Sequence, residues 1–166
     1  MKKSRAKKAV VIIAVLLLFV AVYLFYSRPM TIQERYPMLT LDKCSGFNGY
    51  YREGAEPRLK EFNIDKNSDA FETLCDLLYE RDYRRSLRDL FPRGTRVHRA
   101  EPGDFEWEVL FQIENIVFPD GNVGSGEMLH IQSWYGELDI RFDGETLACY
   151  TSEQEDWAKE VFDIIR

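Results

Sequence analysis

The chain has 166 residues, and its 28 acidic residues outnumber its 22 basic residues, which gives a net charge of −6. An acidic chain repels the phosphates of nucleic acid, so we expect no nucleic-acid partner. Aromatic residues make up 14% of the sequence, which indicates a packed domain rather than a disordered chain.

An apolar segment dominates the N-terminal end. Residues 9–26 are eighteen consecutive uncharged positions, and five basic residues precede them: Lys2, Lys3, Arg5, Lys7 and Lys8. A helix of this length covers about 27 Å, close to the roughly 30 Å hydrocarbon core of a bilayer. The sequence therefore predicts a cytoplasmic basic flank at residues 1–8 and a transmembrane signal-anchor helix at residues 9–27.

The alternative to an anchor is a cleaved signal peptide, which also combines a basic start with an apolar centre. Cleavage after Ser27 would need a small residue at position 25, where this chain has Phe25. We therefore favour an uncleaved, single-pass protein of the cell membrane. The excess of basic residues before the span places the N-terminus in the cytoplasm and the C-terminal domain outside it.

The remainder of the chain is predicted to form a short linker at residues 28–37 and one extracytoplasmic domain at residues 38–166. Six of the 22 basic residues lie at or before Arg28, which leaves 16 basic and 28 acidic residues in the remainder of the chain. The net charge of this part is therefore −12. We expect the bilayer as one partner, through residues 9–27, and an envelope protein or an anionic polymer as another.

Residues 38–51 are predicted to form one or two strands with a turn, and residues 59–64 a further strand. Helical periodicity then appears twice. Ser68 or Asp69 is placed to cap a helix, and the apolar positions that share one face of it are Phe71, Leu74, Cys75 and Leu78. A second set of apolar positions at helical spacing has a different phase: Tyr83, Leu87, Leu90 and Phe91. This change of phase predicts a break near residues 80–83.

The second half reads as antiparallel sheet. Apolar residues alternate with polar ones across residues 105–113, a loop covers residues 119–126, and a further strand is expected at residues 128–134. Asp143-Gly144 predicts a hairpin turn between strands at 138–142 and 146–150. Ser152 and Glu155 form a capping-box pattern that opens a last helix. The fold class is therefore α+β, with an antiparallel sheet and two or three helices packed on one face.

This order of anchor, early helix, hairpins and late capped helix resembles small uncharacterised membrane-anchored extracytoplasmic domains of Gram-positive bacteria. The resemblance covers most of the chain and concerns its layout. It implies no activity and carries over no site residues.

Four arginines form a candidate patch for an anionic group or a partner. Arg81, Arg84, Arg85 and Arg88 would share one face if their segment were helical. Guanidinium groups are suited to bidentate capture of anions. The alternative is a solvated helix face whose arginines pair with nearby carboxylates.

The three cysteines are widely spaced, which fits neither a disulfide framework nor a zinc site. Cys75 is expected as a buried thiol, and Cys44 could form a disulfide with Cys149 in an oxidising compartment. Asp120 begins a loop similar to the start of a calcium site, but Ser125 and Ile131 replace the required Gly and Glu. We expect no metal and no cofactor.

These features favour a non-catalytic, membrane-tethered extracytoplasmic module that binds a protein or an envelope component. One alternative is an envelope hydrolase that uses His98 or His130 as a base, beside a nucleophile such as Ser133 or Cys149. Another is an accessory subunit whose anchor helix packs in a larger membrane complex. The few small residues of that helix give the last reading little support.

Overall fold

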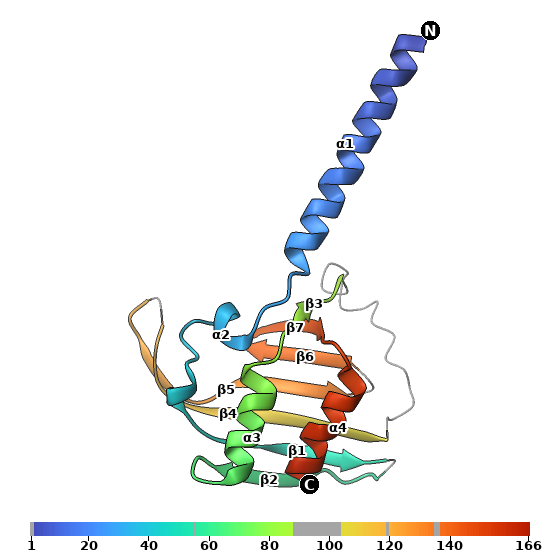
Figure 1. Ribbon diagram of the computed structural model, residues 1–166. Coiled ribbons are helices and arrows are strands. Elements are labelled where there is room, and N and C mark those ends of the chain that lie inside the picture. Colours follow the sequence, from blue (N-terminus) through green and yellow to red (C-terminus); the bar gives the residue numbers. More distant parts are fainter. Residues whose placement is uncertain (1, 55, 88–103, 119, 135–136) are drawn as a thin grey trace.

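The structure is a computed structural model that describes residues 2–54, 56–87, 104–118, 120–134 and 137–166; for residues 2–7 and 9 it describes the backbone only. A long first helix, α1 (Lys2–Tyr26), projects away from a sheet with helices packed against it (Figure 1). Within these described residues, no helix is both long enough and apolar enough to cross a membrane. The transmembrane helix stays a prediction.

In the described part of the chain, seven antiparallel strands form one sheet in the order β2-β1-β4-β5-β6-β7-β3. The strands are β1 (Cys44–Glu53), β2 (Lys60–Asp65), β3 (Arg84–Arg85), β4 (Phe105–Val117), β5 (Val123–Trp134), β6 (Glu137–Phe142) and β7 (Glu145–Tyr150). Neighbours from β4 to β7 are consecutive in the chain, as expected for a series of hairpins. The two-residue strand β3 lies at the edge, beside β7.

The main helices, α3 (Asp69–Tyr79) and α4 (Gln154–Ile165), cover the same face of the sheet (Figure 1). The predicted α+β class and its antiparallel sheet are confirmed. Two shorter elements precede the sheet: helix α2 (Ile32–Arg35) and a 3₁₀ turn at Leu41–Lys43. Ile32 and Tyr36 are buried in the core, so the segment predicted as a linker at residues 28–37 packs against the domain.

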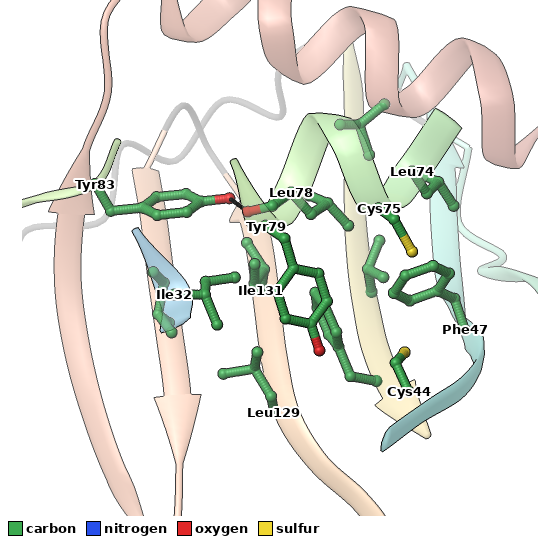
Figure 2. Close-up of a cluster of buried hydrophobic side chains, with 14 of the residues drawn as sticks. Ile32, Cys44, Phe47, Leu74, Cys75, Leu78, Tyr79, Tyr83, Leu129 and Ile131 are labelled. Atoms are coloured by element: carbon green, nitrogen blue, oxygen red, sulfur yellow. Dashed lines mark hydrogen bonds between the residues drawn. The ribbon is translucent and has the colours of Figure 1, made fainter. Parts of the chain in front are cut away.

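The core fills the space between the sheet and its helices (Figure 2). Phe47 of β1 packs against Phe71 of α3 and edge-on against Phe111 of β4, with ring centres 5.1 and 4.9 Å apart. On the α4 side, Trp107 is fully buried and its Nε1 donates a hydrogen bond to the Ala158 carbonyl at 2.8 Å. Aromatic packing therefore joins both helices to the central strands.

Helix α3 follows the sequence prediction closely. The backbone N–H of Phe71 donates to the Ser68 hydroxyl at 3.2 Å, which makes Ser68 the N-cap. All four predicted apolar positions are buried, and the helix ends at Tyr79. The break expected near residues 80–83 is confirmed.

The second helix predicted after this break does not form in the described residues. Tyr83 instead exchanges two backbone hydrogen bonds with Met30, at 3.1 and 2.9 Å, and Arg84 and Arg85 pair with β7. The Tyr83 hydroxyl also donates to the Leu78 carbonyl at 2.9 Å (Figure 2). These long-range pairings satisfy the backbone groups that a helix would otherwise satisfy locally. Leu90 and Phe91 lie outside the described residues.

The predicted start of the last helix is also wrong in detail. Its N-cap is Glu153, with a left-handed backbone (φ 47°), and no side chain caps the helix there. The Gln154 side chain accepts a hydrogen bond from the Thr151 backbone N–H at 3.4 Å. The capping box predicted at Ser152 and Glu155 is therefore not formed.

Candidate functional site

The sheet face opposite α3 and α4, here called the far face, carries most of the polar residues of the central strands. Successive side chains of a strand point to opposite faces. In β4, Trp107, Val109 and Phe111 point to the helices, so Glu106 and Glu108 point to the far face. Charged groups are therefore fixed on a surface built by the most regular part of the fold.

A carboxylate, an imidazole and a guanidinium meet at the centre of the far face. Glu108, His130 and Arg141 come from three adjacent strands, β4, β5 and β6. Glu108 Oε1 lies 3.3 Å from His130 Nδ1 and 3.7 Å from Arg141 Nη1. The hydrogen bond from His130 and the positive charge of Arg141 lower the pKa of Glu108 below its ordinary value, against the opposing effect of burial. Glu108 therefore stays ionised at neutral pH.

Further polar pairs flank this centre. Arg52 of β1 forms an ion pair with the fully buried Glu106, and its guanidinium lies 5.7 Å from the ring centre of Trp134. On the other side, Gln132 Nε2 donates to Asp139 Oδ2 at 3.1 Å. Buried charges and amides persist only with well-placed partners, so this network holds its side chains in fixed positions.

A hollow of about 440 Å³ opens beside His130 and Arg141. Phe118 and Met128 supply an apolar wall, and Thr146 and the β6–β7 turn supply polar atoms. The volume falls within the range of roughly 300–1,000 Å³ typical of small-ligand pockets. The hollow therefore combines apolar area with a few fixed polar groups, the usual composition of a binding site.

The nucleophiles considered for a hydrolase do not reach this hollow. Ser133 stands across from Trp107 and Leu138, on the helix-facing side of the sheet. Cys149 is buried and lies opposite Leu138 in the pairing of β6 with β7, so its side chain is on the helix-facing side as well. Because His130 points to the far face, neither side chain lies beside its imidazole. His98, the other candidate base, lies outside the described residues.

The described residues contain no cluster of three His, Cys, Asp or Glu side chains that could hold a metal ion. In the loop compared with a calcium site, both oxygens of Asp120 accept hydrogen bonds from Asn122, at 3.0 Å from the backbone N–H and 2.6 Å from the side-chain amide. The carboxylate closes the turn between β4 and β5.

The predicted face of four arginines is not assembled, because the segment is not helical. Arg81 is held by the domain: its Nε donates to the Thr151 hydroxyl at 2.8 Å, and its guanidinium lies 5.5 Å from the ring centre of Trp157. Arg84 and Arg85 are consecutive residues of β3, so they point to opposite faces of the sheet. Arg88 lies outside the described residues.

The structure does not bring Cys44 and Cys149 together. Cys44 begins β1 and Cys149 lies in β7, with β4, β5 and β6 between them. Strands lie about 4.8 Å apart, whereas a disulfide needs Cα atoms within about 7 Å. Neither residue forms a disulfide, and both are buried, as is Cys75, for which a buried thiol was predicted.

Sequence reasoning missed the partners of the central carboxylate. The alternation across residues 105–113 predicts a strand with two distinct faces, but it does not place Arg52 or Arg141 beside Glu106 and Glu108. The Asp143-Gly144 turn fixes the β6–β7 register and puts Arg141 opposite Thr146. The Asp143-Gly144 turn was therefore the sequence feature from which the pairing of Arg141 with Thr146, two residues that line the hollow, could have been predicted.

Comparisons with protein-family models, with curated proteins and with solved structures found no match.

Proposed function

We propose that this protein is a membrane-tethered, extracytoplasmic binding module, anchored by α1 and binding an envelope component or protein at the hollow of the far face. The observation that carries the proposal is the exposed apolar surface of α1. Phe19 is 69% exposed and Phe25 72% exposed, and the apolar residues between them are exposed as well. A continuous apolar surface of this kind is unfavourable in water and favourable in lipid.

The junction between α1 and the domain supports tethering close to a membrane surface. The Ser27 hydroxyl donates to the Tyr23 carbonyl at 2.9 Å, and Ser27 is buried. Met30, only three residues after Ser27, already pairs with Tyr83 through backbone hydrogen bonds. Because so little chain separates α1 from the sheet, the domain would follow the helix without a flexible spacer. The basic residues before the apolar segment favour a cytoplasmic N-terminus.

The binding half of the proposal rests on the hollow. Glu108 holds His130 by a hydrogen bond and Arg141 by an ion pair, so a ligand would find both side chains already oriented. Arg141 offers donors, and Glu127 and Asp143 offer acceptors at the rim. A peptide segment or a polar envelope component with both kinds of group would suit this lining.

The experiment for the binding half is site-specific photocrosslinking in cells, with the crosslinking residue introduced at Thr146. A control places it at Glu72, which is exposed on α3 on the opposite side of the sheet. We expect a discrete crosslinked product from position 146 and none from position 72. If both positions give the same products, or neither gives any, the hollow is not the binding surface.

A further inference from the structure

Three arginines gather where α1 enters the domain, and they are called here the arginine cluster: Arg28, Arg35 and Arg85. They follow α1, end α2 and end β3, respectively. The bridge between Met30 and Tyr83 brings the start of the domain beside β3. The Arg85 guanidinium lies 5.4 Å from the ring centre of Tyr26, at the end of α1.

Among the residues that the structure describes, three hydrogen-bond donors of this region are buried without a hydrogen-bond partner: Arg35 Nε, Arg85 Nε and the Tyr36 hydroxyl. Buried donors in folded proteins are almost always satisfied, so such atoms call for an explanation. Tyr36 is held in place by its ring, which packs 4.6 Å from the ring of Phe142. The Tyr36 hydroxyl is therefore fixed by the packing of its ring.

Within the described part of the chain, none of the three arginines forms an ion pair with a carboxylate. Burial, and then the positive charges of Arg85 and Arg28, lower the pKa of Arg35. The neighbouring Glu34 carboxylate is used to accept a hydrogen bond from the Thr31 backbone N–H at 2.9 Å. Burial raises the pKa of Tyr36 to about 12, so its hydroxyl remains a donor at neutral pH. An anion would relieve the repulsion among the arginines and satisfy the donors.

An apolar groove of about 430 Å³ adjoins the arginine cluster. It lies between one side of α1 and Leu87, and its lining is almost wholly apolar. Tyr26 belongs to both features, because its ring lines the groove and contacts the Arg85 guanidinium. A cationic site that continues into an apolar groove matches the two parts of a phospholipid.

We propose that the arginine cluster binds the phosphate of an anionic membrane phospholipid, with an acyl chain of that lipid in the groove beside Leu87. Guanidinium groups bind phosphate through paired, charge-assisted hydrogen bonds. Within a domain of otherwise acidic balance, this cluster would face the headgroups of the membrane that holds α1. The inference rests on the membrane placement in the proposed function and adds a specific lipid contact to it.

The experiment uses the full chain in micelles of an uncharged detergent. Phosphatidylglycerol, phosphatidylcholine or inorganic phosphate is titrated in, and the thermal unfolding midpoint is followed by tryptophan fluorescence. We expect phosphatidylglycerol to raise the midpoint, because a ligand that binds the native state stabilises it. Phosphatidylcholine, whose choline offsets the phosphate charge, and inorganic phosphate, which has no acyl chain, should act much more weakly.

Arg35→Gln and Arg85→Gln should each weaken the phosphatidylglycerol effect at least ~10-fold in apparent affinity, since each removes a charged donor. Arg58→Gln is the matched control, because Arg58 is exposed and lies between β1 and β2 at the other edge of the sheet. Without lipid, the two cluster variants should be at least as stable as the wild type, because each removes a repelling charge. If a glutamine variant does not fold, Arg85→Lys keeps the charge, removes the paired geometry and should still bind the lipid more weakly.

An equal effect of inorganic phosphate would assign the site to a soluble anion and overturn the lipid proposal. Equal binding by Arg58→Gln, Arg35→Gln and Arg85→Gln, or no response to any anion, would overturn it as well. These micelle titrations do not depend on where the protein resides in a cell. Failure here is therefore distinguishable from failure of membrane tethering.

Discussion

Glu108 Oε1 lies 3.3 Å from His130 Nδ1, across the pairing of β4 with β5 on the far face. The two residues are 22 positions apart in the chain, and only the register of the sheet makes them neighbours. Glu108 thereby positions His130, and it also pairs with Arg141; both of these residues line the hollow.

This contact predicts a pH-dependent contribution of Glu108 to stability. Its pKa in the folded state lies below the ordinary value of 4.5, so the contribution is present above about pH 4.5 and is lost as the pH falls through the lower folded value. Glu108→Gln should lower the free energy of unfolding by about 1 kcal/mol at pH 7, since the group is only partly buried. The difference should shrink below pH 4.5, as urea unfolding across pH would measure. A difference that stays constant with pH would contradict the ion pair.

The N-caps of α3 and α4 give a second prediction. The sequence pattern and the structure agree on Ser68 but disagree on Ser152. Ser68→Ala should destabilise the protein by about 1 kcal/mol, because the Ser68 hydroxyl accepts the Phe71 N–H. Ser152→Ala should have little effect, because Glu153 rather than Ser152 is the N-cap of α4. Thermal unfolding of the two variants compares them directly. Equal losses of stability would show that Ser152 does cap α4.

The indole of Trp107 gives a third prediction. Trp107→Phe removes the donor to the Ala158 carbonyl and leaves space at a fully buried position, so we expect a loss of about 2–4 kcal/mol. Trp134→Phe is the control, because Trp134 is only half-buried. Denaturant unfolding measures both. A loss at Trp107 no larger than that at Trp134 would contradict the packing of α4 on β4.

The cysteines give a fourth prediction. Burial raises the pKa of Cys44 to about 11 and that of Cys75 to about 12, so these thiols should react very slowly in the folded protein. In denaturant without reductant, a thiol reagent should count three thiols, since none of the three cysteines forms a disulfide. A count of one would mean that two cysteines are joined in a disulfide, contrary to the structure.

The sequence predicted the elements whose local pattern agrees with their packing. The alternation in β4 and the Asp143-Gly144 turn each specify a strand or hairpin without distant information. The prediction failed at residues 83–85, where helical spacing of apolar residues coincided with a segment that pairs with Met30 and β7. Tertiary pairing overrode a weak local preference there.

The candidate sites could be predicted only in part. The alternation across residues 105–113 separates core-facing from outward-facing positions. The partners of Glu108, however, depend on a β4–β5 register with two irregularities, near Gln112 and between Ile113 and Ile116. No local pattern reveals such shifts. The residues of the arginine cluster come from three separate segments of the chain. One of them, Arg35, belongs to a four-residue helix that was not predicted from the sequence.

Membrane tethering by α1 is tested most directly by extracting cell membranes with alkaline carbonate and locating the full-length chain. We predict that the chain remains in the membrane pellet, because lipid would hold the exposed apolar side chains of α1. A variant with Leu16→Asp and Val20→Asp should move to the supernatant, since charges at the centre of a span oppose insertion. Release of the full-length wild-type chain into the supernatant would contradict the account.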